Sequence, residues 1–167
     1  QDMYFSDYAV TNETVGIPSE AVKTLAENDA VESVSTTRLS VFMPGAGDIL
    51  PFETDLSVQS HETLQLVNVD EAQLQIYTPN LSAQDKQALK DGTGCLVKNP
   101  IAFSYGDTTV QQTDLTVGDT IQLGDRTLPV LGLIDTAITI NNDGFTNGVQ
   151  LIVNDEIYCS LLGNDSY

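Results

Sequence analysis

The sequence contains few residues of the types used in catalysis, and their spacing matches no recognisable catalytic site. The single histidine, His61, lies in a polar Ser-His-Glu stretch just before an expected strand. A general base needs a partner held within hydrogen-bond reach, and the surrounding sequence shows no sign of one. There is no second imidazole for a zinc site, and no serine or cysteine stands in a nucleophile motif. We therefore predict that His61 is a surface residue and that the chain has no catalytic residues.

Two groups of polar residues look like metal ligands but fail in detail. The segment Thr139–Gly144 has the Asn, Asp and Gly of a calcium loop. Its first residue and Gln150, however, fall where the first and last ligands should be carboxylates. Three aspartates are spaced through expected turns, where aspartate is favoured for backbone hydrogen bonding alone; they are Asp114, Asp119 and Asp125. The sequence predicts no metal site.

Phosphate and sugar chemistry are also poorly supported. The run Gly92–Gly94 lacks the lysine and the following helix of a phosphate-binding loop. A carboxylate pair for glycoside hydrolysis stays open because acidic residues are so numerous, although nothing singles out a pair. We predict that the chain is not an enzyme and binds no cofactor; a small hydrolase is the weakest alternative.

The two cysteines, Cys95 and Cys159, do not form a CxxC redox or zinc pattern. Cys95 begins an expected apolar strand, and Cys159 lies in an expected helix on the side shared with Leu162. Free cysteine is among the most buried residue types. We predict two small buried hydrophobic residues, with a disulfide as the alternative.

The chain is strongly acidic. Its 167 residues include 24 acidic and 6 basic residues, and the formal net charge is -18. Nucleic acid and anionic membrane surfaces are poor partners for such a chain. The acidity either keeps an exposed domain soluble, which we favour, or attracts cationic ligands such as basic peptides. No apolar run approaches the length of a membrane helix, and no signal peptide begins at Gln1. We expect any membrane anchor to lie outside this sequence.

Apolar patterning predicts one α+β domain, or one domain with an inserted lobe. Its most regular part is a hairpin of Thr120–Leu123 and Leu128–Ile134, joined by a turn at Gly124 and Asp125. Within it, Gly132 is expected to let a neighbouring backbone approach closely. The other expected strands are centred on Tyr8 and Val10, within Val31–Met43, and at Thr63–Val69, Gln73–Tyr77 and Val149–Val153.

Capping residues mark three expected helices. The first opens at Pro18 or Ser19 and places Ala21, Val22, Leu25 and Ala26 on one face. The second, Ala83–Lys90, is capped by Ser82 with Asp85 three residues on and is ended by Gly92. The third, Glu156–Leu162, begins after Asn154 and Asp155 and ends at Gly163.

The loop Pro44–Ser60 is rich in proline and glycine at its start, as loops are. Three apolar residues within it, Ile49, Leu50 and Phe52, form either an exposed contact for a partner or a segment packed under neighbouring strands. We favour packing and keep the three as the candidate partner-contact residues.

Five segments in order resemble the extracytoplasmic domain of FtsX-like, MacB-like ABC transporter permeases. They are Leu25–Ser35 (LAENDAVESVS), Leu89–Val97 (LKDGTGCLV), Leu115–Leu123 (LTVGDTIQL), Leu128–Leu133 (LPVLGL) and Val149–Leu162 (VQLIVNDEIYCSLL). The first segment is similar to a family helix followed by a "VESVS" type of sequence. The middle three are similar, in order, to a glycine-led strand, a "GDT" hairpin and its return strand. The last is similar to the strand and helix that precede the second membrane span. The loop 44–60 matches no family motif, and no return strand follows the last helix.

The resemblance implies a discontinuous α/β lobe, called porter-like, from residues 1–45 and 145–167, and a β-rich, sabre-like lobe from residues 46–144. It implies a domain on the extracytoplasmic side of the cell membrane, held between transmembrane helices of the same permease. A cytoplasmic ABC ATPase, a second permease copy, and a peptide, lipoprotein or partner protein would be its partners. The alternative is a secreted or cell-surface binding or adhesion module with an acidic face.

Overall fold

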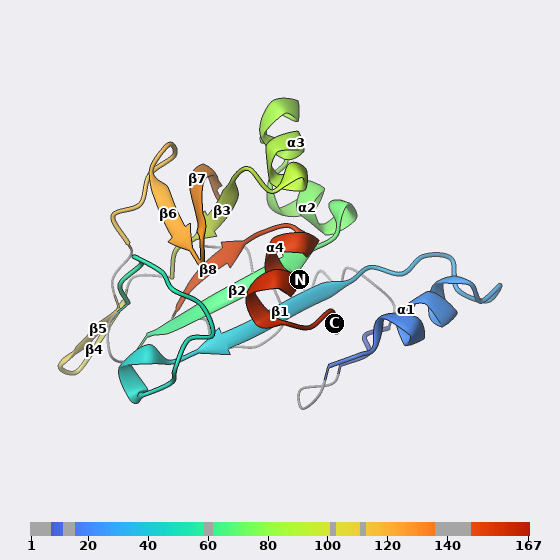
Figure 1. The fold of residues 1–167 in the computed structure, drawn as a ribbon, viewed down its shortest axis with the longest axis horizontal. Helices are drawn as coiled ribbons and strands as arrows, with labels where there is room; N and C mark the ends of the chain where they lie inside the picture. The colour runs from blue at the N-terminus through green and yellow to red at the C-terminus, as the bar shows by residue number, and fades with distance from the viewer. Residues whose placement is uncertain (1–7, 12–15, 59–61, 101–102, 111–112, 136–147) are drawn as a thin grey trace.

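The computed structural model describes residues 8–11, 16–58, 62–100, 103–110, 113–135 and 148–167 (Figure 1). Two regions named above, His61 and the Thr139–Gly144 segment, lie outside these ranges. In the described part of the chain, six strands form one mixed sheet in the order β1-β2-β8-β3-β7-β6. Figure 1 shows β6 and β7 turned steeply against β1 and β2, so that the sheet curls.

The strands combine antiparallel and parallel neighbours. The six are β1 (Thr37–Phe42), β2 (Thr63–Val69), β8 (Gly148–Ile152), β3 (Cys95–Lys98), β7 (Arg126–Leu133) and β6 (Thr120–Leu123). The pairs β2–β8 and β3–β7 are parallel, and the other three pairs are antiparallel. A separate hairpin joins β4 (Phe103–Tyr105) to β5 (Thr108–Val110). The predicted hairpin of β6 and β7, with its turn at Gly124 and Asp125, is confirmed.

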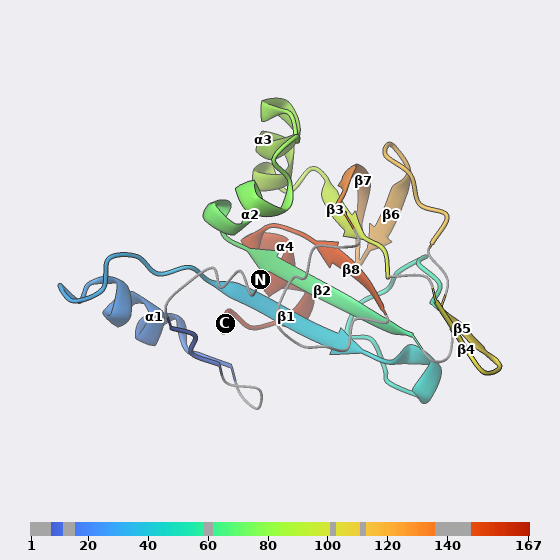
Figure 2. The same ribbon diagram turned by 180° about the vertical axis from the view of Figure 1, so that it is seen from behind.

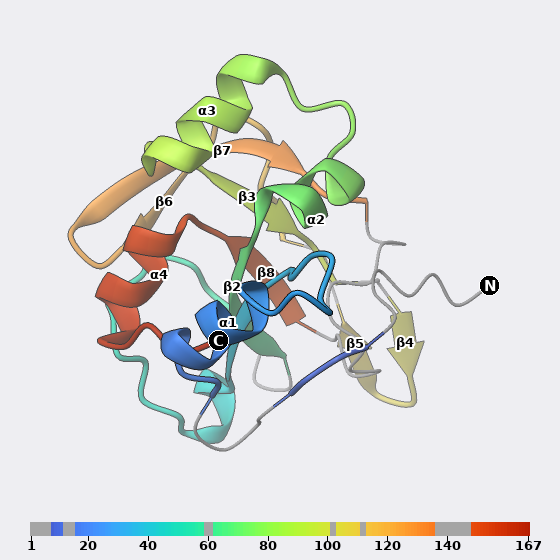
Figure 3. The same ribbon diagram turned by 90° about the vertical axis from the view of Figure 1, so that its right-hand side faces the viewer.

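Helices cover both faces of the sheet. Helix α4 (Asp155–Leu162) lies on one side of β2 and β8, and α2 (Glu71–Tyr77) lies on the other with α3 (Ala83–Asp91) beyond it (Figures 2 and 3). Successive residues of a strand point to opposite faces. Leu64 and Leu66 of β2 therefore join the core beneath α4, whereas Val67 joins the core beneath α2 and α3.

The predicted cap of α3 is confirmed, and α4 begins at Asp155, one residue before its expected start, with Asn154 as its cap. Ser82 Oγ accepts from Asp85 N at 3.1 Å, and α3 ends at Gly92, whose φ is 75°. Asn154 Oδ1 accepts from Ile157 N at 2.9 Å, and α4 ends at Gly163. A side-chain oxygen satisfies one of the free N–H groups of the first helical turn, which fixes where each helix begins.

Residues 71–77 form helix α2, so the predicted strand Gln73–Tyr77 is wrong. Asp70 caps this helix, since its Oδ1 accepts from Gln73 N at 3.0 Å. The buried Gln73 amide donates to Thr36 O and to the hydroxyls of Ser35 and Thr37. A helix of seven residues, about two turns, with few apolar residues carries too short a pattern to distinguish the helical period of 3.6 from strand alternation.

Asp70 is expected to matter for stability because it serves two segments. Its Oδ2 accepts from Ser35 Oγ at 2.6 Å and from Thr36 N at 2.8 Å, in addition to the cap of α2. We expect Asp70→Ala to lower the free energy of unfolding by about 2 kcal/mol, as measured by urea denaturation. The matched control Glu32→Ala removes an exposed carboxylate of the same region and should change it by under about 0.5 kcal/mol. Equal effects would contradict a bridging role.

The N-terminal region departs most from the predictions. Helix α1 (Ser19–Ala26) begins at Ser19, one of the two expected positions. None of its residues is buried, and on its apolar face only Val22 is half-buried. Strand β1 occupies only the second half of Val31–Met43. Residues 8–11 contain no strand, and Tyr8 is 90% exposed. Alternating residues with nothing to pack against do not form a stable strand.

The close backbone approach occurs at Gly148 rather than at Gly132. A Cβ added to Gly148 would lie 2.3 Å from the carbonyl oxygen of Thr63 on the neighbouring strand. A Cβ on Gly132 would meet only side-chain atoms, at 3.1 Å from Leu81 and 3.4 Å from Leu96. The expectation for Gly132 is therefore corrected, because its neighbours are side chains that can move.

Candidate functional site

The structure separates the three candidate partner-contact residues. Phe52 is buried and packs edge-to-face on Phe42, with ring centroids 5.9 Å apart. Leu50 is half-buried against the same core, whereas Ile49 is 91% exposed. The loop therefore packs through Leu50 and Phe52, as favoured above, but it presents Ile49 to solvent.

The loop is anchored at both ends. After the short 3-10 turn η1 (Pro44–Ala46), Asp48 Oδ2 accepts from Met43 N at 2.8 Å. Further on, Glu53 O accepts from Gly124 N at 2.8 Å, and Asp55 Oδ1 accepts from Gln122 N at 2.9 Å. These bonds cover the outer edge of β6, which would otherwise expose unpaired backbone groups.

Two shallow grooves adjoin this anchored segment. The first encloses about 570 Å³ and is lined by Pro44, Leu50, Phe52, Glu53, Thr54, Leu56, Ser57, Val58 and Gln122. The second encloses about 390 Å³ and is lined by Asp55, Leu56, Ser57, Thr113, Asp114, Leu115, Asp119, Thr120 and Ile121. Leu56 and Ser57 belong to both, so the two form one surface, here called the loop groove.

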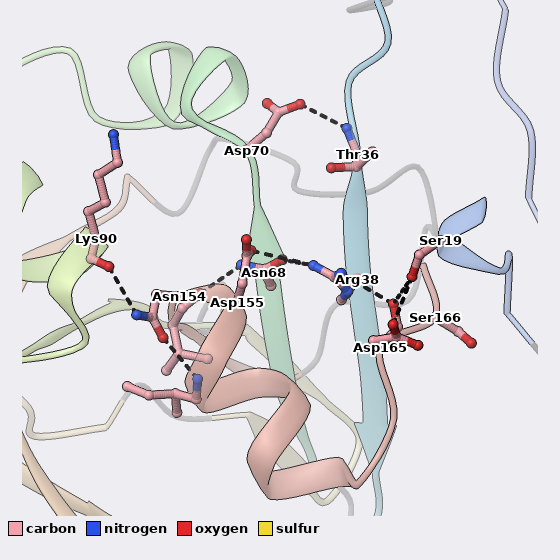
Figure 4. Close-up of polar contacts among 12 residues, drawn as sticks. Ser19, Thr36, Arg38, Asn68, Asp70, Lys90, Asn154, Asp155, Asp165 and Ser166 are labelled. Carbon is pink, nitrogen blue, oxygen red and sulfur yellow. Dashed lines mark hydrogen bonds and ion pairs between the residues drawn. The ribbon is translucent and has the colours of Figure 1, made fainter. Parts of the chain in front are cut away.

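A structural feature that the sequence did not predict is a buried arginine on β1. Arg38 Nη1 donates to Asn68 Oδ1 at 2.8 Å and lies 3.4 Å from Asp155 Oδ1, while Nη2 donates to Asp165 O at 3.2 Å (Figure 4). Its guanidinium also lies over the ring of Tyr167, 3.8 Å from the centroid. We call these contacts the Arg38 clamp. The one sequence signal was a basic residue within a β-branched, apolar strand.

The Arg38 clamp brings distant parts of the chain together. It holds the tail 164–167 against β1 and β2, and the same tail contacts the segment before α1. Ile17 N donates to Tyr167 O at 2.6 Å, and Tyr167 N donates to Ile17 O at 2.9 Å. Ser19 Oγ donates to Asp165 at its backbone oxygen and its carboxylate (Figure 4). Residues 16–19 and 164–167 therefore lie side by side.

A row of polar side chains crosses the middle of the sheet beneath the surface. The amide of Gln150 on β8 donates to Gln65 Oε1 on β2 at 2.7 Å, and Lys98 is the partner of Gln150 on β3. All three are buried. Burial lowers the pKa of Lys98, and the charge of Asp135 acts in the opposite direction. The sequence predicted the three strands but not this row of polar side chains.

The two cysteines are free and differ in environment. Cys95 is buried within β3, and desolvation raises its pKa to about 12, whereas Cys159 on α4 is half-buried. Only the thiolate reacts, so a raised pKa and burial both protect Cys95. At pH 8 we expect iodoacetamide to modify Cys159 and leave Cys95 intact, and both to react in urea, as followed by peptide mass spectrometry. Equal native rates would contradict the buried position of Cys95.

Potential metal ligands are scattered over the described residues. Among them, no three His, Cys, Asp or Glu side chains gather closely enough to hold a metal ion. No helix in the described ranges has the length and apolar character needed to cross a bilayer.

Comparison with known proteins gives a match in fold. The chain is similar to the extracellular domain of the noncanonical ABC-type transporter YknZ from Gram-positive bacteria, with a TM-score of 0.51 over 91% of this chain and 70% of that domain. The two sequences are 11% identical. No protein-family model matches the sequence, and no curated protein matches it. The chain thus has a mixed α+β fold, with a curled six-stranded sheet, that resembles the extracellular domain of an ABC-type transporter.

Proposed function

We propose that this chain is the extracytoplasmic domain of an FtsX-like, MacB-like ABC transporter permease, held between two membrane helices on the outer side of the cell membrane. The observation that carries the proposal is the pairing of segments 16–19 and 164–167. A domain inserted between two membrane helices needs its entry and exit segments close together. The likeness in fold to a transporter's extracellular domain supports the same assignment.

Under this proposal the chain has two lobes that share one sheet. Residues 1–45 and 145–167 make the α/β, porter-like lobe, which contains β1, β8 and α4. Residues 46–144 make the β-rich, sabre-like lobe, which contains β2, β3, β6 and β7. Since β8 lies between β2 and β3, a displacement of the first lobe is passed to the second through backbone hydrogen bonds.

The mechanism is transmission of movement rather than catalysis. ATP hydrolysis by a cytoplasmic ABC ATPase would move the membrane helices of a permease dimer, and these would pull on segments 16–19 and 164–167. The Arg38 clamp fastens the second segment to β1 and β2. The domain would then act on a peptide, lipoprotein or partner protein outside the membrane.

The location can be tested on the full-length gene product in intact cells. In a Cys159→Ser background, Ile49→Cys places a thiol at a position that is 91% exposed in the native residue. We expect a membrane-impermeant maleimide to label it without lysis, and the protein to remain in the membrane fraction with an ABC ATPase. Labelling only after lysis would overturn the proposal. Recovery of the labelled protein from the medium without detergent would indicate a secreted binding module instead.

A further inference from the structure

Arg38 belongs to the sheet, yet its contacts also determine where helix α1 lies. We propose that Arg38 is a latch. It fixes the position of α1, to which it makes no hydrogen bond, by holding the tail 164–167, and its release frees α1 and the tail together. The latch itself is a property of this chain alone, whereas its use in passing movement from membrane helices to the sheet rests on the proposed function.

Helix α1 lies apart from the sheet, beyond the start of β1 (Figures 1 and 2). None of its residues is buried, and none belongs to either apolar core of the described residues. Every hydrogen bond that joins segment 16–26 to a distant part of the described chain goes to the tail. Ile17 pairs with Tyr167 through two backbone bonds, and Ser19 donates to Asp165. The tail is therefore the support of α1.

The tail is in turn fastened to the sheet through one side chain. Arg38 Nη2 donates to Asp165 O at 3.2 Å (Figure 4), and the guanidinium lies over the ring of Tyr167. In the described part of the chain, no other residue of the sheet forms a hydrogen bond or a ring contact with the tail. Arg38, the tail and α1 thus form a series of contacts, in which each link depends on the one before.

The two chain connections of this series to the body of the domain, which is the sheet with α2, α3 and α4, can bend. The linker 32–34 between α1 and β1 forms no hydrogen bond with the described residues, and the backbone is held again only where Asp70 accepts from Thr36 N. The tail leaves α4 at Gly163, whose φ is 70°. Short connections of this kind act as hinges. Release at Arg38 therefore lets α1 and the tail move while the sheet stays folded.

The contacts of Arg38 suit release. Two of its partners, Asn68 and Asp155, belong to the body and stay with Arg38 when the tail leaves. While the tail is held, the buried Nε of Arg38 has no hydrogen-bond partner among the described residues, and an unpaired buried donor costs free energy. Departure of the Tyr167 ring would open the guanidinium to water. This gain offsets part of the loss of the contacts with the tail, so the latch is weaker than its number of contacts suggests.

Double electron–electron resonance on the 167-residue chain measures the position of α1 directly. In a Cys159→Ser background, spin labels at Thr24→Cys on α1 and Thr127→Cys on β7 occupy exposed positions. Arg38→Gln removes the link between the sheet and the tail. Arg126→Gln is the matched control, because it neutralises an arginine in an exposed ion pair of the body.

Gly16→Ala breaks the link between the tail and α1 instead. Gly16 has a φ of 74°, and an added Cβ would lie 2.8 Å from Ser166 Cβ and 3.0 Å from Tyr167 O. Combining it with Arg38→Gln tests the series, because breaking two links of one series has no larger effect than breaking one. Thermal unfolding of each variant confirms that it is folded. If Arg38→Gln does not fold, Tyr167→Leu takes its place, since it removes the ring and leaves the bond from Arg38 to Asn68.

We expect a single narrow distance distribution in the native chain and in the Arg126→Gln control. The distribution in Arg38→Gln, or in Tyr167→Leu in its place, should be at least about twofold broader. Gly16→Ala should broaden it to a similar extent, and the double variant should be no broader than the broader of its two single variants.

Three results would each overturn the latch: a broad distribution in the native chain, an unchanged width in either single variant, or widths that add in the double variant. Addition would mean that α1 is fastened to the body along two independent routes. None of these measurements needs a membrane. Failure of the latch is therefore distinguishable from failure of the permease assignment, which the labelling of Ile49→Cys tests on intact cells.

Discussion

Replacing Arg38 with alanine is expected to lower the free energy of unfolding by about 3 kcal/mol and to release the tail 164–167. The ion pair with Asp155 contributes little, because that carboxylate is 79% exposed and the separation is 3.4 Å. The larger losses come from the buried Asn68 Oδ1, left without this donor, and from the stacking on Tyr167. The buried Nε of Arg38 has no hydrogen-bond partner, and its desolvation costs free energy in the native chain. Because the substitution removes this cost, the net loss of stability is smaller than the sum of the lost contacts.

Urea denaturation and hydrogen exchange check this prediction together. The amide of Tyr167, which donates to Ile17 O, should exchange faster in Arg38→Ala. Arg126→Ala is the matched control, since it breaks an exposed pair with Glu156 and should cost under about 1 kcal/mol. The loss of stability in Arg38→Lys should lie between those of Arg38→Ala and Arg126→Ala. A lysine keeps the positive charge, but its ammonium lacks the planar guanidinium that reaches Asn68 and Asp165 while stacking on a ring. Unchanged exchange at Tyr167 would show that Arg38 does not hold the tail.

The second large effect is expected at Gly148, where alanine should cost more than about 3 kcal/mol or prevent folding. The added Cβ would lie 1.9 Å from Thr63 Oγ1, 2.3 Å from Thr63 O and 2.8 Å from its carbonyl carbon. Two of these atoms belong to the backbone of β2, so the strands themselves would have to separate. Soluble yield and urea denaturation measure the result.

Two further variants separate a backbone conflict from ordinary crowding. Adding Thr63→Ala to Gly148→Ala removes the hydroxyl but leaves the carbonyl, so we expect little recovery of stability. Gly132→Ala places its Cβ 3.1 Å from a terminal carbon of Leu81, which can rotate, and should cost at most about 1 kcal/mol. A full rescue by Thr63→Ala would show that the side chain, and not the strand spacing, limits residue 148.

Local features of the fold were predictable from the sequence because local chemistry determines them. The caps at Ser82 and Asn154 and the turn at Gly124 each depend on residues within a few positions. Helix α2 was not predictable in the same way, since its buried face depends on Gln73 reaching Ser35 and Thr37 on another element. In this segment, tertiary contacts stabilise a helix although the local sequence pattern favours a strand.

Long-range pairing accounts for what the sequence could not predict about the site. The loop groove needs Asp55 beside Gln122, 67 residues along the chain, and the Arg38 clamp needs Asp165, 127 residues away. The periodicity of apolar residues along the sequence does not indicate contacts between such distant residues. Leu50 and Phe52 could be named as packing residues from composition, but their groove partner, Gln122, could be named only from the structure.

The position of β8 determines when the chain can fold during synthesis. This strand pairs with β2 on one side and β3 on the other, and Gln65 lies 85 residues before its partner Gln150. Until the ribosome has released residue 152, β2 and β3 each lack a neighbour and expose a strand edge, which is prone to pairing with other chains. Non-local parallel pairing of this kind is also slow to form. The sheet is therefore completed only after residue 152 has been synthesised, and until then the nascent chain exposes edges of β2 and β3 that favour aggregation.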